Sequence, residues 1–223
     1  MDGKIESVPL DYDLYQFGHG ILSDSAYANK FVGIRVIRDP RDIIVSGYLY
    51  HKRTSERWAN RVTKQGQQYL GFPDVPKSLA HESDENKMKF VSQKNGISYR
   101  EMINSLSTNE GLIYEMHGYA QITINSMLNF RKHPDVLSVK LEDFESDFND
   151  TLFRIFRHIG EMPEEVVSEL VIRCKKFDIS TIDTSLDPHI STGKVRKWDD
   201  YFSEEVLSAY TKIYGVAHEE LGY

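Results

Sequence analysis

The sequence is poor in the features that build disulfides, cysteine-rich metal sites and membrane spans. Cys174 is the only cysteine among 223 residues, so no intrachain disulfide and no cysteine-rich zinc site can form. The N-terminal stretch MDGKIESVPLDYDLYQ lacks the apolar core of a signal peptide, and no later run is long and apolar enough to span a bilayer. We therefore expect a soluble, cytoplasmic protein that holds no metal.

Basic residues are outnumbered by acidic ones. The formal net charge is −7 and the isoelectric point is about 5.6, which argues against nonspecific binding of nucleic acid but leaves room for a local site that binds a small anion. Hydrophobic residues make up 40% of the chain and aromatic residues 12%, a composition that favours a packed core over disorder. The length suits one domain, and we expect residues 1–223 to form it.

The order of apolar segments predicts strands that alternate with helices. Predicted strands, bounded by turn residues, lie at 12–18 (YDLYQFG), 31–37 (FVGIRVI, read as buried) and 135–140. Predicted helices lie at 41–50 with an extension towards 58, at 98–106, at 111–130, on both sides of Gly160, and after DDYFSEEV near the end. The polar region 60–97 is predicted as a long functional loop. This alternation indicates an α/β domain with a mainly parallel sheet flanked by helices.

Two arginines stand where the second predicted strand meets its helix. Asp39 is predicted to cap this helix, with Pro40 at its first position. Arg38 then lies at the carboxyl end of a parallel strand, where α/β folds bind ligands, beside a helix N-terminus that favours anions. Ser46, eight residues later, is in position to donate to the same anion. The simpler alternative is that Arg38 and Arg41 only pair with surface carboxylates.

A second basic stretch, STGKVRKWDDYFSEEV, occupies residues 191–206. A glycine among basic residues, followed by a tryptophan and a helix start, suits a flexible flap over an anion. The alternative is a solvated charged loop anchored by Trp198. The letters STGK do not form a phosphate-binding Walker loop, because Lys194 is followed by Val195 and Arg196 and no strand or upstream glycine precedes it at the required spacing.

Together these stretches resemble the sulfotransferase family, which transfers a sulfuryl group from 3′-phosphoadenosine-5′-phosphosulfate (PAPS) to an alcohol or amine. VIRDPRDIIVSGYLYH resembles the family's 3′-phosphate motif, and GKVRKWDDYFSEE resembles its C-terminal Arg-Lys-Gly loop with the following tryptophan. VLSVKLEDFESDFNDTLFRIFRHIG, between them, is similar to the family's Tyr-Glu-Asp strand and helix, and YREMINSLSTNEGLIYEM to a stretch of bacterial members. The similarity runs in the right order from about residue 12 to the end.

The resemblance implies a P-loop-type sulfotransferase fold, PAPS as co-substrate without a metal, and a small-molecule or carbohydrate acceptor. It implies that Arg38 and Ser46 hold the 3′-phosphate and that His19 is the general base, because an imidazole that titrates near neutral pH suits removal of the acceptor's proton. Without the resemblance, His19 is an ordinary loop histidine between two glycines. Further predicted cofactor contacts are Thr192, Gly193, Lys194 and Arg196.

The sequence departs from the family in several places, of which two bear most on the predicted cofactor site. Nothing in residues 1–18 resembles the Lys-x-Gly-Thr-Thr-Trp loop that cradles the 5′-phosphosulfate, so we expect an N-terminally incomplete domain, either truncated or a natural relative without that loop. Where Arg-Lys-Gly is usual, the chain has Ser191-Thr192-Gly193, and Lys194 with Arg196 are predicted to supply the displaced charge. A catalytically inactive relative that binds nucleotide or a protein partner is the alternative function. A kinase is disfavoured by the lack of a Walker lysine.

Overall fold

The computed structural model describes residues 4–5, 21–22, 27, 30–60, 97–178, 181 and 195–223. The predicted strand at 12–18 and almost all of the predicted loop at 60–97 lie outside these residues. So do four of the predicted site residues, namely His19, Thr192, Gly193 and Lys194.

The strands of the described residues form two parallel pairs. β1 (Lys4–Ile5) pairs with β2 (Ile21–Leu22), and β3 (Gly33–Ile37) pairs with β4 (Val136–Lys140). The predicted strands at 31–37 and 135–140 are thus confirmed, and their pairing is parallel. β3 is only partly buried, however, because Val36 is 51% exposed while Ile37 is 8% exposed, so the prediction of a buried strand was too strong.

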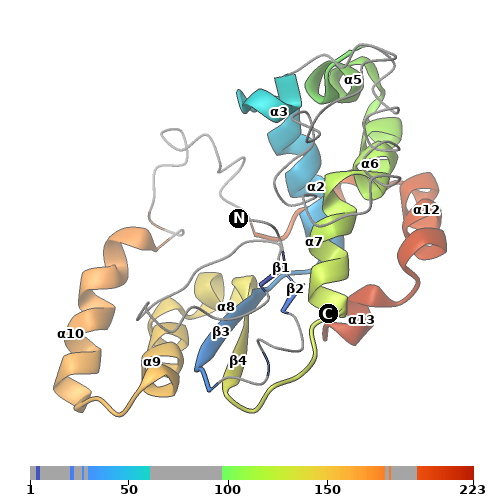
Figure 1. The fold of residues 1–223 in the computed structure, drawn as a ribbon. Coiled ribbons are helices and arrows are strands. Elements are labelled where there is room, and N and C mark those ends of the chain that lie inside the picture. The colour runs from blue at the N-terminus through green and yellow to red at the C-terminus, as the bar shows by residue number, and fades with distance from the viewer. Residues whose placement is uncertain are drawn as a thin grey trace.

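Helices dominate this mixed α/β structure. The first group contains α2 (Pro40–His51), α3 (Arg57–Asn60), α5 (Tyr99–Ser105), α6 (Thr108–His117) and α7 (Tyr119–Leu128). The second contains α8 (Leu141–Ser146), α9 (Phe148–Ile159), α10 (Glu164–Cys174) and the 3₁₀ turn η2 (Lys175–Phe177). The chain closes with α11 (Trp198–Tyr201), α12 (Glu204–Tyr214) and α13 (Ala217–Glu220). Figure 1 shows the β3–β4 pair between α8–α10 on one side and α2, α6 and α7 on the other.

Helix α2 begins as the sequence predicts. The Asp39 side chain accepts a hydrogen bond from the Arg41 backbone N–H at 2.8 Å, and Pro40 supplies the first helical position. The helix ends at His51 rather than continuing to Trp58, since a short separate helix, α3, follows it. Arg38 is therefore fixed at the point where β3 passes into α2.

The single helix predicted at 111–130 is two helices, α6 and α7, which meet at Gly118. This glycine has φ −100° and ψ −122°, and a Cβ added there would lie 2.5 Å from the Tyr99 hydroxyl. Helical spacing in the sequence predicts one apolar face formed by Leu112, Met116, Tyr119 and Ile122. Because the helix breaks at Gly118, Tyr119 and Ile122 are only partly buried, whereas Ile124 is fully buried.

The pattern of the last predicted helix places Val206, Leu207, Tyr210 and Ile213 on its buried face. On α12, Val206 and Tyr210 are buried as this pattern predicts. Leu207 is 43% exposed, so its predicted burial is wrong. It stands one residue, about 100° of helical rotation, from Val206 and therefore leaves the face that meets α6.

The core joins α2, α5, α6, α7 and α12, and within it α2 and α6 approach closely at two glycines. A Cβ at Gly47 would lie 2.6 Å from Glu115 Oε1, and a Cβ at Gly111 would lie 2.5 Å from Tyr48 Cε2. Tyr48 and Glu115 are 2% and 0% exposed, so neither side chain has room to withdraw. The two glycines thus set the distance between α6 and α2, the helix that begins two residues after Arg38.

Replacing Gly111 with alanine is expected to destabilise the protein. Alanine improves helix propensity by about 1 kcal/mol, but overpacking against the buried Tyr48 ring costs about 1–3 kcal/mol, so the cost of overpacking exceeds the gain in propensity. Urea unfolding should show a lower midpoint for Gly111→Ala. Gly160→Ala is the matched control and should leave the midpoint unchanged, because a Cβ there meets nothing within 4 Å. Equal midpoints for the two variants would contradict the close approach.

Candidate anion-binding site

Arg38 and Ser46 lie in contact. Arg38 Nη1 donates a hydrogen bond to Ser46 Oγ at 2.8 Å, so the strand end folds back against the second turn of α2. Because the serine oxygen accepts this bond, its own O–H remains able to donate to a ligand. The geometry brings a guanidinium and a hydroxyl donor together at the carboxyl end of β3, where ligands bind in parallel α/β folds.

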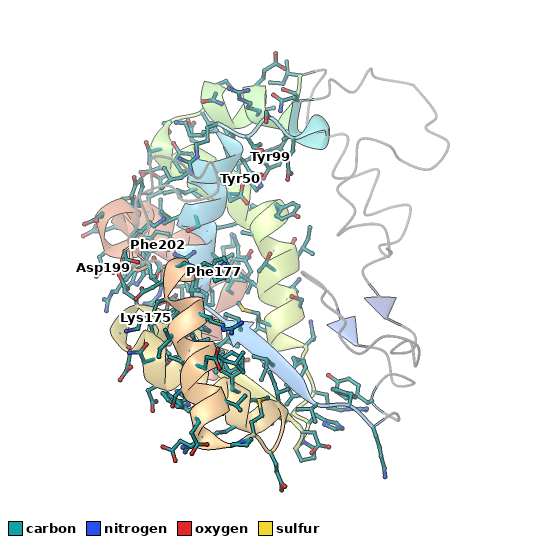
Figure 2. All side chains as sticks on the ribbon, turned by 90° about the vertical axis from the view of Figure 1, so that its left-hand side faces the viewer. Tyr50, Tyr99, Lys175, Phe177, Asp199 and Phe202 are labelled. Atoms are coloured by element: carbon teal, nitrogen blue, oxygen red, sulfur yellow. The ribbon has the colours of Figure 1, made fainter. Side chains whose placement is uncertain are left out.

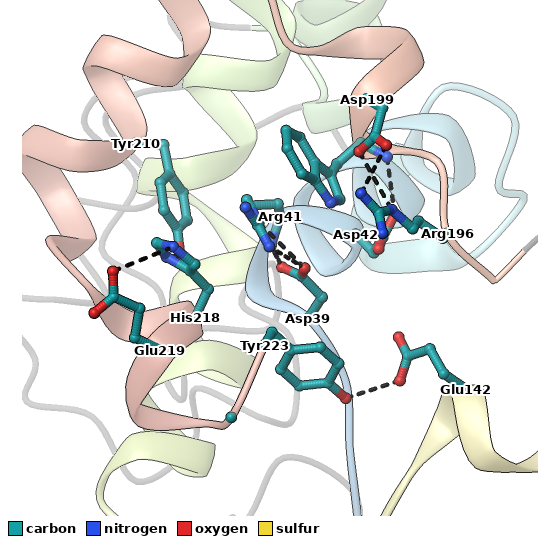
Figure 3. Close-up of polar contacts among 12 residues, drawn as sticks. Asp39, Arg41, Asp42, Glu142, Arg196, Asp199, Tyr210, His218, Glu219 and Tyr223 are labelled. Carbon is teal, nitrogen blue, oxygen red and sulfur yellow. Dashed lines mark hydrogen bonds and ion pairs between the residues drawn. The ribbon is translucent and has the colours of Figure 1, made fainter.

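The residues 195–198, which we call the C-terminal segment, lie against the same end of α2. Arg38 Nη2 donates to the Val195 carbonyl oxygen. Asp42 Oδ1 accepts the backbone N–H groups of Lys197 at 2.6 Å and Trp198 at 2.9 Å. Figure 3 shows Asp42 beside Arg196 of this segment and Asp199 of α11. The two basic stretches of the sequence therefore meet in space.

The other two arginines near this point are paired. Arg41 forms a 2.6 Å ion pair with Asp39 and lies over the Trp198 ring at 4.0 Å. Arg196 pairs with Asp199 at 2.8 Å, and its side chain is 65% exposed (Figure 3). Of the two arginines in the simpler alternative, Arg41 does pair with a carboxylate, although Asp39 is buried, while Arg38 is held by a hydroxyl and a carbonyl.

The helix N-terminus is less open to an anion than the sequence suggested. Asp39 already accepts the Arg41 N–H, and Asp42 adds a second carboxylate in the first turn. These two carboxylates already interact with the positive end of the α2 dipole. Selectivity for an anion therefore falls on the side chains of Arg38 and Ser46.

Burial shifts the pKa values of three charged groups at the site. It lowers the pKa of Arg38, opposed by the carboxylates of Asp42 and Glu142, and it raises the pKa of Asp42. Burial, followed by the charge of Arg38, lowers the pKa of Lys197 to about 8. Lys197 is 6% exposed. A guanidinium and an ammonium held close together in a buried setting favour a bound anion.

Two buried polar atoms at the carboxyl ends of β3 and β4 have no hydrogen-bond partner among the described residues. They are Arg38 Nε and Glu142 Oε1. Arg38 and Glu142 follow strand ends that are level, since Ile37 is in register with Lys140. The second Glu142 oxygen accepts the Tyr223 hydroxyl at 2.8 Å. A donor such as Arg38 Nε is what a phosphate oxygen needs, so Arg38 fits the 3′-phosphate of the implied co-substrate, whereas Glu142 Oε1 is an acceptor and does not.

Of the predicted site residues within the described ranges, the structure brings Arg38 and Ser46 into contact and directs Arg196 to Asp199. Phe177, which by the same family resemblance matches an aromatic residue near the adenine, lies at the end of η2 and is 61% exposed (Figure 2). Sequence reasoning missed Asp42 and Lys197. Asp42 is the last residue of residues 38–42, which match the Arg-x-Pro-x-Asp part of the 3′-phosphate motif, and Lys197 stands directly before Trp198, so both had a signal in the motifs. No signal in the sequence indicated that Asp42 would accept a hydrogen bond from the Lys197 backbone.

The pKa of Lys197 leads to a test by pH. In the unfolded chain this lysine keeps its proton up to its ordinary pKa near 10.5, whereas in the folded protein it loses the proton near pH 8. The unfolded state therefore binds more protons in that window, and the free energy of unfolding should rise with pH. From about pH 7 to about pH 9.5 we expect wild type to gain on the order of 1 kcal/mol relative to Lys197→Met. A difference that is flat with pH in parallel denaturant titrations would contradict a buried ammonium.

No helix in the described ranges is long and apolar enough to cross a membrane. Within those ranges there is also no group of three or more His, Cys, Asp or Glu side chains arranged to hold a metal ion.

A family model described as "Sulfotransferase domain" matches residues 18–222. This range begins one residue before His19 and includes the Arg38–Ser46 pair and the C-terminal segment. No curated protein and no solved structure gives a significant match.

Proposed function

The chain belongs to the sulfotransferase domain family, because that family's model covers almost its whole length, and we propose that it binds PAPS and transfers the sulfuryl group to a hydroxyl or amine of a small-molecule or carbohydrate acceptor. The observation that supports the proposal most is the Arg38–Ser46 contact at the carboxyl end of β3. A P-loop-like fold, with a larger parallel sheet than the described strands form, belongs to the same proposal. So does a cytoplasmic location.

In this function the described residues bind and orient the nucleotide. Arg38 offers Nε, and Ser46 its hydroxyl hydrogen, to the 3′-phosphate. Lys197 adds positive charge from the C-terminal segment. Sulfuryl transfer depends on in-line positioning and on stabilisation of charge on the leaving oxygen more than on covalent catalysis. Groups that bind and orient the nucleotide therefore contribute directly to the rate.

The predicted catalytic step uses a residue outside the described ranges. His19 removes the proton of the acceptor hydroxyl as its oxygen bonds to sulfur, while the bond from sulfur to the phosphate oxygen breaks and 3′,5′-adenosine bisphosphate leaves. Thr192, Gly193, Lys194 and Arg196 are proposed to contact the nucleotide from the basic loop.

The experiment that tests this function has two stages. The chain is first titrated calorimetrically with 3′,5′-adenosine bisphosphate, and then incubated with sulfur-radiolabelled PAPS and a panel of hydroxylated acceptors. Binding followed by labelled product, both reduced in Arg38→Ala, supports the transferase. Binding with no product on any acceptor supports the alternative of an inactive relative that binds nucleotide. A folded chain that binds neither nucleotide contradicts both.

A further inference from the structure

Asp42 is a buried carboxylate for which nucleotide binding by Arg38 and Ser46 gives no reason. It is 1% exposed and lies in the first turn of α2, four residues after Arg38. A negative charge near an anion site opposes phosphate binding, and burying it carries a desolvation cost that raises its pKa. Some other contribution must offset both penalties.

The contacts of Asp42 show what it contributes. One oxygen, Oδ1, accepts the backbone N–H groups of both Lys197 and Trp198, which follow it by 155 and 156 residues. Backbone N–H groups that are buried without an acceptor destabilise a protein, so Asp42 satisfies two donors at once. The same carboxylate thereby fixes the point at which the C-terminal segment meets α2.

Fixing the C-terminal segment also fixes Arg38. The Arg38 guanidinium donates from Nη1 to Ser46 and from Nη2 to the Val195 carbonyl. Val195 is 4% exposed and stands two residues before Lys197. Two anchors on different elements hold the plane of the guanidinium, while Nε has no hydrogen-bond partner among the described residues. One anchor disappears if the C-terminal segment moves.

We propose that Asp42 is a positioning residue: it holds the C-terminal segment against α2, so that the Val195 carbonyl keeps the Arg38 guanidinium oriented for the 3′-phosphate. This inference rests on the proposed function for its ligand. Preorganisation of this kind improves affinity because the ligand does not have to order the side chain that binds it. Asp42 acts through Arg38 and does not touch the nucleotide.

A different role for Asp42 is that of a counter-charge to Arg38, since the two charges interact. Asparagine separates the two roles. Asp42→Asn keeps an oxygen that accepts both N–H groups and removes the negative charge, whereas Asp42→Leu keeps the shape and removes the acceptor. A positioning role predicts that Asp42→Asn preserves binding of the nucleotide and that Asp42→Leu weakens it. A counter-charge role predicts that both variants lose it.

The test measures two quantities in wild type and both variants. One is the NMR-detected hydrogen exchange of the Lys197 and Trp198 amides in the ligand-free protein, and the other is the Kd for 3′,5′-adenosine bisphosphate. We expect Asp42→Asn to keep the amide protection and to bind within about threefold of wild type, and Asp42→Leu to lose the protection and bind at least about tenfold more weakly. If Asp42→Leu does not fold, Asp42→Ala replaces it, because water can then reach the two N–H groups.

Asp150→Leu is the matched control, because Asp150 is an exposed acidic residue in the first turn of another helix, α9. It should change neither quantity. Equal weakening by Asp42→Asn and Asp42→Leu, or full protection and affinity in Asp42→Leu, would overturn the proposal. Failure of wild type to bind the nucleotide would instead contradict the proposed function, so the two failures are distinguishable.

Discussion

Glu115→Ala is expected to lower the free energy of unfolding by about 3–5 kcal/mol, because it leaves two buried hydrogen-bonding partners without their acceptor and opens a cavity in the core. Glu115 is 0% exposed in α6, and its Oε2 bonds to His51 Nδ1 at 2.8 Å and accepts the Tyr99 hydroxyl at 2.9 Å. Removing it leaves both partners without this acceptor and opens a cavity. Tyr99 reaches this cluster from α5 (Figure 2).

Denaturant unfolding measures this loss, and Glu110→Ala is its control. Glu110 lies on the same helix but is exposed, where it completes the capping box with Ser107. Its removal should cost far less than removal of Glu115. If the two variants unfolded at the same denaturant concentration, the His51–Glu115–Tyr99 cluster would not support the core.

The His51–Glu115–Tyr99 cluster matters for the anion site because it anchors α2, and the first turn of α2 lies at that site. His51 is the last residue of α2, while Arg38 and Asp42 stand at the other end. A loosened α2 would therefore disturb nucleotide binding as well as stability.

Arg38→Ala is expected to weaken binding of 3′,5′-adenosine bisphosphate by about thirtyfold or more, equivalent to about 2 kcal/mol for a lost charge-assisted contact. It also removes the donors to Ser46 and to the Val195 carbonyl. Arg38→Lys retains the charge but not the planar fork, so it should bind between wild type and Arg38→Ala. Isothermal titration calorimetry measures all three affinities.

The control for Arg38→Ala is Arg173→Ala. Arg173 is 72% exposed on α10 and pairs with Glu169 on the same helix. Its loss removes the same charge from the protein while leaving the site intact. Equal weakening by both variants would show that the effect is one of net charge, and would remove Arg38 from the binding site.

Local sequence signals predicted the contact at the centre of the site. Asp39-Pro40 fixes where α2 begins, and an eight-residue separation puts Ser46 on the second turn, so its contact with Arg38 follows from local geometry. The strands β3 and β4 were predicted for a similar reason, since short β-branched runs bounded by turn residues carry their own signal.

Long-range contacts carried no such signal. The bonds from Lys197 and Trp198 to Asp42 cross more than 150 residues, and no periodicity links those positions. Glu115 lies beside the buried Met116, yet a glutamate in an amphipathic pattern predicts exposure. Its burial depends on His51 and Tyr99, which lie 64 and 16 residues away in the sequence. Gly118 was ambiguous as well, because a lone glycine in a helical pattern either stays helical or ends the helix.

The most direct test of a 3′-phosphate site at Arg38 compares two nucleotides on two proteins. Calorimetry gives the affinities of 3′,5′-adenosine bisphosphate and of adenosine 5′-monophosphate, which lacks the 3′-phosphate, for wild type and for Arg38→Ala. We expect wild type to prefer the bisphosphate by at least about tenfold, and Arg38→Ala to remove most of this preference while changing the affinity for the monophosphate little. A wild type without the preference, or an Arg38→Ala variant that keeps it, would contradict such a site.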